Sequence, residues 1–229
     1  MADNNITLAV LDMAGTTVAD GGLVLRAFDA AATSAGLATE GPERDSARRY
    51  VIDTMGQSKI VVFRALLGDE RRAQAANLAF ESAYAALLDE VDIAPIPGAA
   101  EAISTLRTAG VKVALSTGFS ATTRDRLLEA LGWTDIADLV LAPQDAGRGR
   151  PYPDMVLTAL LRLGIDAVDQ VAVLGDTSSD IASGLAAGAR IVAGTRTGAH
   201  DEQRLRAAGA THVVASVTEF THLILTDRH

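Results

Sequence analysis

The chain has 229 residues, 48% of them hydrophobic, and carries a formal net charge of −9. This length can bury one large core, or a core with a smaller insertion, and the acidic balance argues against nucleic-acid partners, which require a concentrated basic face. The sequence contains no cysteine, which excludes a disulfide framework and any cysteine-based zinc site or nucleophile.

The N-terminal segment MADNNITLAV has no basic region before its apolar run and is too short for an export signal. No apolar stretch in the sequence approaches the length of a membrane span. We therefore expect a cytoplasmic protein that has no membrane partner.

Six short apolar runs predict the strands of one sheet. Most of them are continuous rather than alternating, which is typical of parallel strands that are covered on both faces. The runs cover residues 6–11, 111–115, 139–142, 171–174, 190–193 and 212–215.

Segments with apolar residues at helical spacing lie between the later strands, and a glycine follows each of them. They cover residues 99–109, 120–131 and 179–187. A glycine just past the last helical residue is the expected C-terminal stop. The alternation of strands and helices predicts an α/β protein with a Rossmann-like, doubly wound parallel sheet.

One region interrupts this alternation, because residues 21–94 contain no good strand pattern. Helical patterns cover residues 25–35, 43–52, 58–67 and 71–88, and the prolines of APIPG then end the helical run. We interpret residues 1–18 and 96–229 as a catalytic core and residues 19–95 as an inserted helical cap. Ligands in such folds bind at the carboxyl ends of the strands, where this insertion would lie as a lid.

Polar side chains follow several predicted strands at their carboxyl ends. They are Asp12 after the first strand, Ser116 and Thr117 after the second, Arg150 in the loop after the third, and Asp176 and Asp180 after the fourth. A single aspartate of this kind could be a helix N-cap, and a single arginine could be solvated surface. Neither explanation accounts for a matching group at successive strand ends, so the set predicts a phosphate site.

The carboxylates of this set suit a divalent metal. Mg²⁺ takes one or two protein carboxylates and keeps room for water and substrate oxygens, and Asp12 and Asp176 can supply them. Asp180 lies one helical turn beyond Asp176 and could orient that carboxylate or a metal-bound water. We therefore expect Mg²⁺ as the cofactor.

The remaining groups suit a phosphoryl group, whose transfer requires charge neutralisation and an in-line nucleophile. Thr117 and the Gly118 backbone can donate hydrogen bonds to it, and Arg150 can neutralise its charge. Gly15 and Thr16 let the chain turn tightly past the nucleophile and expose backbone N–H groups to phosphate.

Four motifs occur in order: D-x-x-G-T, S-T-G, G-R-P-Y-P and G-D-T-x-S-D. Together they resemble the haloacid dehalogenase superfamily, whose members carry an aspartate nucleophile on a Rossmann-like core with a mobile cap. The resemblance implies that Asp12 is the nucleophile, and that Thr117 and Arg150 bind the phosphoryl group. It also implies that Asp12, the Ala14 carbonyl and Asp176 hold Mg²⁺.

Ala14 departs from the superfamily, which usually has a second aspartate at this position. That aspartate protonates the leaving alkoxide and then activates water, and such assistance is typically worth about 10²–10⁴ in rate. Alanine can do neither. The protein could be a weakened ester phosphatase or a non-catalytic binding protein, or its leaving group could be handled by another residue.

Lys59 is the candidate for that other residue. It lies at the start of an apolar cap helix with Met55, Ile60 and Phe63 nearby in the sequence, and desolvation and a helix N-terminus both disfavour an ammonium ion. An amine in such an environment can form a Schiff base. Spacing alone favours a solvated lysine, or one that pairs with a substrate carboxylate, over an imine-forming one.

The nucleophile loop D-x-A-G-T-T-V-x-D, the arginine of G-R-P-Y-P and M-x-x-x-K-I in the cap resemble the phosphonatase (phosphonoacetaldehyde hydrolase) branch of the superfamily. This resemblance implies that Lys59 forms an imine with a substrate aldehyde, so that the C–P bond breaks without an acid at Ala14. It also implies a homodimer formed through the cap. Two positions differ from the branch, which tends to have histidine at Val62 and tyrosine at Phe119.

The sequence thus predicts a Mg²⁺-dependent hydrolase of a small organophosphorus substrate, with phosphonoacetaldehyde favoured. We place Asp12, Lys59, Thr117 and Arg150 in the catalytic machinery, and Met55 beside the substrate. The alternative is a phosphatase of small monoesters such as phosphoglycolate. A non-catalytic binding protein is the remote third reading.

Overall fold

The computed structural model describes residues 5–226; residues 1–4, part of the segment in which the sequence predicts no export signal, and residues 227–229 lie outside it. Within the described range, six strands form one sheet in the order β3-β2-β1-β4-β5-β6, and neighbouring strands are parallel. The strands are β1 (Leu8–Asp12), β2 (Lys112–Ser116), β3 (Leu139–Leu141), β4 (Val171–Gly175), β5 (Ile191–Thr195) and β6 (His212–Val214). This arrangement confirms the predicted Rossmann-like α/β fold.

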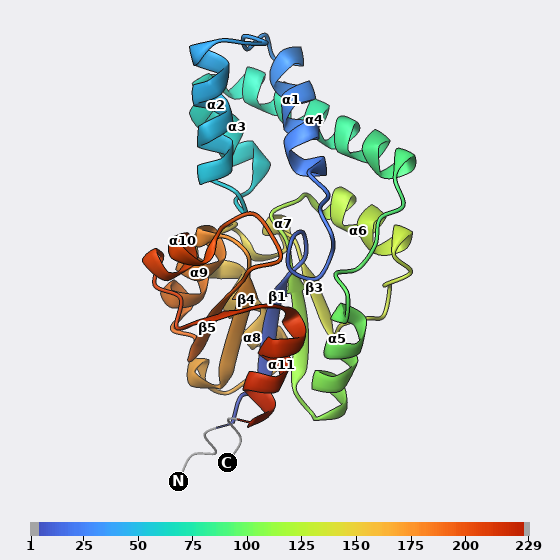
Figure 1. The fold of residues 1–229 in the computed structure, drawn as a ribbon, viewed down its shortest axis with the longest axis vertical. Coiled ribbons are helices and arrows are strands. Elements are labelled where there is room, and N and C mark those ends of the chain that lie inside the picture. The colour runs from blue at the N-terminus through green and yellow to red at the C-terminus, as the bar shows by residue number, and fades with distance from the viewer. Residues whose placement is uncertain (1–4, 227–229) are drawn as a thin grey trace.

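Helices cover both faces of the sheet (Figure 1). Side chains of α5, α6 and α11 pack on one face, and those of α8, α9 and α10 on the other. These helices, with the short α7, are α5 (Ala99–Thr108), α6 (Ala121–Ala130), α7 (Pro143–Ala146), α8 (Asp154–Arg162), α9 (Ser178–Ala187), α10 (Glu202–Ala207) and α11 (Val217–Thr226), and a 3₁₀ turn, η1 (Val168–Gln170), precedes β4.

The central strand β1 shows why the strands read as continuous apolar runs. Successive side chains of a strand point to opposite faces, so Leu8 and Val10 pack with α8, while Ala9 and Leu11 pack with α5 and α11. Because both faces are covered, all five residues of β1 are buried. The carboxyl end of this buried strand delivers Asp12 to the edge of the sheet.

Four helices follow β1 before the chain returns to the sheet, and we call them the cap helices. They are α1 (Leu23–Ser34), α2 (Pro42–Asp53), α3 (Lys59–Leu67) and α4 (Glu70–Glu90). Helix α4 packs against α1 and α3, and an aromatic cluster fills the space between them, with Phe28 stacked on Phe63 and Phe63 edge-on to Phe80. Figure 1 shows the cap helices over the carboxyl edge of the sheet.

Two connections join the cap helices to the rest of the chain, and they lie side by side. Val18 and Pro95 form an antiparallel bridge, and the backbone N–H of Ala19 donates to the carbonyl of Ala94 at 3.0 Å. The backbone N–H of Ile96 donates to the carbonyl of Thr17 at 2.9 Å. The chain therefore leaves the sheet and returns to it at one place, beside the nucleophile loop.

Helices α7, α8, α10 and α11 are not predicted by the sequence patterns above. Segments this short are marginal helices by themselves, and they gain their stability from packing. Met155 and Val156 of α8, for example, are buried against the same face of the sheet as Leu8 and Val10. The helix forms although it directly follows the prolines of G-R-P-Y-P. None of the helices in residues 5–226 combines the length and apolarity that a membrane crossing requires.

Candidate active site

A cavity of about 360 Å³ lies between the carboxyl ends of the strands and the cap helices. Nine of the eleven residues that the sequence predicts for the site line it. They are Asp12, Ala14, Gly15, Thr117, Gly118, Arg150 and Asp176 from the sheet side, with Met55 and Lys59 from the cap side. The other two, Thr16 and Asp180, lie behind the wall and contact residues that form it.

Arg150 is held in the middle of the site by three side chains. Its Nη1 donates to Oδ1 of Asp12 at 2.6 Å, and its Nη2 donates to Oγ of Ser116 at 2.7 Å. Its Nε forms an ion pair with Oδ1 of Asp180 at 2.8 Å. With Arg150 and Asp12 each only 5% exposed, the guanidinium is fixed in direction rather than solvated, which rules out the surface-arginine reading.

Three buried carboxylates meet beside this arginine. Asp12, Asp176 and Asp180 each offer an oxygen within 4.8 Å of the others. Burial raises the pKa of Asp12 to about 7, with the nearby Arg150 opposing the rise and Asp180 adding to it. Burial, followed by the charges of Asp12 and Asp180, also raises the pKa of Asp176 well above its usual range.

The electrostatics of this cluster fit a bound cation. Three carboxylates with one arginine leave excess negative charge in a buried space, and a hard divalent ion relieves such an excess with oxygen ligands. The raised pKa values of Asp12 and Asp176 indicate that protons reduce this excess charge when no cation is bound. The donor set is therefore suited to a divalent metal.

Helix α9 holds the carboxylates in place through its first turn. Thr177, not Asp176, is the N-cap: its hydroxyl accepts from the backbone N–H of Asp180 at 3.3 Å, and Oδ2 of Asp180 accepts from the backbone N–H of Thr177 at 3.0 Å. This reciprocal capping box frees Asp176 to face the cavity. The N-cap interpretation of Asp176 is therefore wrong.

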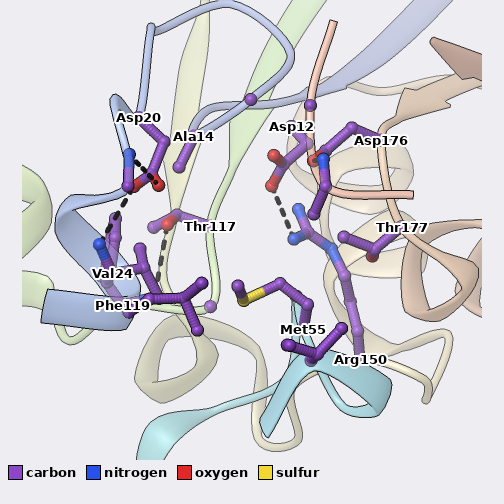
Figure 2. A pocket seen from close by; sticks show the side chains of 18 of the residues that line it. Asp12, Ala14, Asp20, Val24, Met55, Thr117, Phe119, Arg150, Asp176 and Thr177 are labelled. Atoms are coloured by element: carbon purple, nitrogen blue, oxygen red, sulfur yellow. Dashed lines mark hydrogen bonds and ion pairs between the residues drawn. The ribbon is translucent and has the colours of Figure 1, made fainter. Parts of the chain in front are cut away.

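The nucleophile loop passes very close to Asp176. Gly15 has φ +88, and a Cβ added there would lie 2.4 Å from Oδ2 of Asp176, so this position needs glycine for both conformation and space. The hydroxyl of Thr16 donates to Oδ1 of Asp176 at 3.3 Å. Ala14 lines the cavity, and Figure 2 shows its methyl group to one side of Asp12, opposite Asp176 and Arg150.

Lys59 enters the cavity from the first residue of α3. Ser58 stands at the N-cap position but makes no side-chain capping bond. The ammonium group lies over the rings of Phe119 and Phe80, with Nζ 5.5 and 5.9 Å from their centroids. Burial lowers the pKa of Lys59 to about 8, although Asp20 and Asp12 oppose the change. The free amine is thus far more populated at neutral pH than in an ordinary lysine.

The loop after β2 forms the contact between the sheet side and the cap side. Thr117 is buried, and its Oγ1 accepts from the backbone N–H of Phe119 at 3.2 Å. A Cβ added at Gly118 would lie 2.6 Å from the carbonyl oxygen of Gly56 and 2.8 Å from that of Gln57. Only glycine therefore allows the segment between α2 and α3 to approach so closely.

Two parts of the site are missing from the sequence-based prediction. Asp20 lines the cavity eight positions after Asp12 on the same loop, and residues 197–199 after β5 complete the wall. Within residues 197–199, the backbone N–H of Ala199 donates to Oδ2 of Asp176 at 2.7 Å. The rule that sites lie at strand ends would have found residues 197–199, since β5 neighbours β4.

Comparison with known proteins gives consistent results. A family model described as a haloacid dehalogenase-like hydrolase matches residues 6–188. The chain is 30% identical to a phosphonoacetaldehyde hydrolase of Salmonella paratyphi A, with 96% of this chain and 95% of that protein covered. It is 28% identical to a Dickeya dadantii protein named "Probable phosphatase IndB", with 93% and 90% covered.

One solved structure resembles the fold along almost the whole chain. It is a phosphonoacetaldehyde hydrolase-like protein from Oleispira antarctica, with a TM-score of 0.83, 24% identity, and 97% of this chain and 92% of that chain covered. At this identity the likeness concerns the fold. These matches agree with the resemblance indicated by the four sequence motifs.

Proposed function

Since the chain belongs to the haloacid dehalogenase-like hydrolases, we propose that it hydrolyses a small organophosphorus compound by phosphoryl transfer to Asp12, and that this compound is phosphonoacetaldehyde or a close analogue. Membership of this family of enzymes disfavours the non-catalytic alternative. The observation that carries the proposal is the presence of Lys59, with a pKa of about 8, in the same cavity as Asp12.

The carboxylate cluster would hold Mg²⁺ through Asp12, the Ala14 carbonyl and Asp176, with Asp180 supporting them from behind. The buried excess of negative charge supports this assignment. When bound, the ion neutralises charge on the phosphoryl oxygens during transfer.

Arg150 opposes the protonation of Asp12 and fixes the direction of its carboxylate. The guanidinium bond at 2.6 Å favours the carboxylate over the acid, and burial leaves this carboxylate poorly solvated and so a better nucleophile. Arg150 also lies where it can neutralise the phosphoryl group, while the hydroxyl of Thr117 and the backbone of Gly118 donate to its oxygens. These residues bind the phosphorus half of the substrate whatever the organic half is.

Lys59 acts on the organic half. Its free amine attacks an aldehyde carbon and forms an imine, which draws the electron pair of the C–P bond into an enamine as phosphorus bonds to Asp12. No alkoxide leaves in this reaction, so an acid at the position of Ala14 is unnecessary. Phe119 and Met55 give the organic half an apolar wall.

The cap helices serve as lid and specificity element in this proposal, with residues 19–95 as the inserted unit and the two side-by-side connections as its hinge. Closure over the cavity excludes water and brings Lys59 to the substrate. The homodimer through the cap stays a prediction, and sedimentation of the purified protein tests it.

Borohydride trapping tests the role of Lys59. The chain has only two lysines, Lys59 and the exposed Lys112, so a reduced adduct is readily assigned by peptide mass spectrometry. We expect an adduct on Lys59 with phosphonoacetaldehyde, and a loss of activity of about 10⁴-fold or more in Lys59→Ala, since a covalent group is removed. Lys112→Ala is the matched control. Full activity in Lys59→Ala, with no adduct in the wild type, would refute the imine.

A phosphatase of small monoesters such as phosphoglycolate is the second candidate. The similarity to the protein named "Probable phosphatase IndB" supports it, and a protonated Lys59 could then pair with a substrate carboxylate. Phosphate release from phosphonoacetaldehyde and from a panel of monoesters separates the two functions. A higher kcat/KM for a monoester would favour the second.

A further inference from the structure

Four carboxylates lie in or directly behind the cavity wall, and three of them form the buried cluster described above. Asp12 and Asp180 bind Arg150, and Asp176 accepts from the backbone N–H of Ala199. The fourth is Asp20, which forms no ion pair with a lysine or arginine among residues 5–226. It is the one cavity carboxylate that neither the metal cluster nor the arginine uses.

The structure holds the Asp20 carboxylate in a defined direction. Oδ2 accepts from the backbone N–H of Gly22 at 3.1 Å, and Oδ1 accepts from that of Val24 at 3.3 Å, both at the start of α1. Figure 2 shows these bonds and places Asp20 beside Ala14. Each carboxylate oxygen has a second lone pair, so the group keeps acceptor capacity toward the cavity in which it lies.

Asp20 and Lys59 act on each other across this cavity. The charged groups that face Lys59 are Asp20, Asp12, Arg150 and Asp176, and among them Asp20 stabilises the ammonium most strongly. Lys59 is the cation that acts on Asp20, and the phenol of Tyr84 also responds to the Asp20 charge. No direct hydrogen bond joins the two side chains in the described chain, and both line the cavity.

We propose that Asp20 is the acid–base catalyst of imine formation and hydrolysis on Lys59. This inference rests on the proposed function and gives a role to a carboxylate that is otherwise without one. Asp20 supplies the proton transfer for which residues 19–95 offer no histidine. The branch tends to have histidine at the position of Val62, which is buried here and lies outside the cavity lining.

The proton balance of this step is closed. Lys59 adds to the aldehyde carbon and forms a carbinolamine; protonated Asp20 then gives its proton to the hydroxyl, which leaves as water while the nitrogen lone pair forms the C=N bond. After C–P cleavage, solvent protonates the enamine carbon. Water then adds to the product iminium while the Asp20 carboxylate takes the proton back, and a second carbinolamine forms. Its hydroxyl proton passes to the Lys59 nitrogen as the C–N bond breaks, which releases the aldehyde and the free amine. Burial raises the pKa of Asp20, which favours the acid form that the first step needs.

The test measures the rate of borohydride trapping with phosphonoacetaldehyde as a function of pH in the wild type and in Asp20→Asn. Asparagine keeps a side-chain oxygen for the start of α1. We expect trapping to be about 10²-fold slower, as for loss of a general acid. Removal of the charge lowers the pKa of Lys59 and makes more free amine, so a slower rate cannot come from a smaller population of free amine.

The pH profile separates catalysis from a structural role. The trapping rate of the wild type should follow a bell-shaped pH profile, limited by the Lys59 ammonium at low pH and by the Asp20 carboxylate at high pH. The trapping rate of Asp20→Asn should instead rise with pH to a plateau. Added acetate should restore trapping in Asp20→Ala. Asp69→Asn is the matched control, because Asp69 caps α4 through a bond from the N–H of Arg72 at 2.8 Å and lies outside the cavity lining.

The outcomes distinguish this inference from the proposed function. No trapping in the wild type would overturn the imine and the inference together. Wild-type trapping with an unchanged rate and an unchanged pH profile in Asp20→Asn would overturn the role of Asp20 alone. If the melting temperature of Asp20→Asn is too low for the variant to be purified, the trapping rate of Asp20→Ala with added acetate decides between the two roles. A merely structural defect does not respond to acetate.

Discussion

At the scale of single residues, the proposed function assigns the cavity residues to the two halves of a substrate. Arg150 and the carboxylate cluster converge on the phosphorus side, where Asp12 is held by a 2.6 Å bond. Lys59, Asp20 and Ala14 also line the cavity, and in the proposal they serve the organic half of the substrate. Ala14 gains its meaning from this division, because the groups near it that can carry protons are a lysine and an aspartate from the cap side.

The first prediction concerns Ala14. Ala14→Asp should raise the hydrolysis of phosphate monoesters by up to about 10²–10⁴-fold, because it supplies a general acid beside the nucleophile. Phosphate release from a panel of monoesters measures the effect. Ala14→Asn is the control, since it adds similar volume without an acid. Equal ester activity in the two variants would contradict the prediction.

At the scale of elements, several contacts besides the connections hold the cap helices on the sheet, and three of them lie near the end of α2. The loop after β2 abuts the segment between α2 and α3 at Gly118. The imidazole of His200 accepts from the N–H of Ser178 at 2.9 Å and donates through Nε2 to the carbonyl of Ile52 at 3.0 Å. Arg204 also pairs with Asp53 at 2.9 Å. The end of α2 is therefore attached next to the loops that follow β4 and β5, which carry Asp176 and Ala199.

The second prediction concerns Gly118. Its new Cβ in Gly118→Ala would meet carbonyl oxygens at 2.6 and 2.8 Å, so the segment that carries Lys59 must move away. We expect kcat/KM to fall by about 10²-fold, the cost of a small misplacement of reacting groups. The melting temperature should change little, since the movement is confined to one contact.

Steady-state kinetics and differential scanning calorimetry on the same samples check this. Gly132→Ala is the comparison, because its Cβ meets nothing within 4 Å and the change costs only the strain of a left-handed residue, about 1 kcal/mol. Normal kcat/KM in Gly118→Ala would show that the contact does not position Lys59.

At the scale of the whole molecule, the buried carboxylates connect folding to metal binding. Asp12 and Asp176 have raised pKa values, so the folded protein holds protons that the unfolded chain releases near pH 4. Without metal, their contribution to stability is present below that pH and is lost as the pH rises toward about 7, where Asp12 titrates. A metal ion replaces those protons.

The third prediction follows from this linkage. A fixed Mg²⁺ concentration of about 100 times the Kd at pH 8 should stabilise the fold at that pH by about 2.7 kcal/mol, which corresponds to a rise in Tm of about 5–10 °C for a chain of this size. The rise should be larger at pH 8 than at pH 5.5, because the ligands must be deprotonated. Calorimetry with and without Mg²⁺ measures it, and Asp176→Asn is the control. Equal shifts at the two pH values would contradict the linkage.

The sequence by itself determined the architecture and most of the residues that meet in the cavity. Continuous apolar runs mark strands covered on both faces, and polar residues placed just after them share one edge of a parallel sheet, so local pattern was enough for Asp12, Thr117, Arg150 and Asp176. The family model that matches residues 6–188 confirms the family membership that the motifs predict. Short helices such as α8 were missed because their stability comes from packing rather than from pattern.

Tertiary structure alone decided which cap residues reach the site. Lys59 is separated from Asp12 by the whole of α1 and α2, and only the packing of the cap helices brings its amine into the cavity and lowers its pKa to about 8. Asp20 closes the nucleophile-loop motif but receives no role from the sequence, and its proposed role depends on the charge of Lys59, which lies across the cavity. Burial and the distance between charges are properties of the folded chain, and these two quantities set the protonation of Asp20 and Lys59.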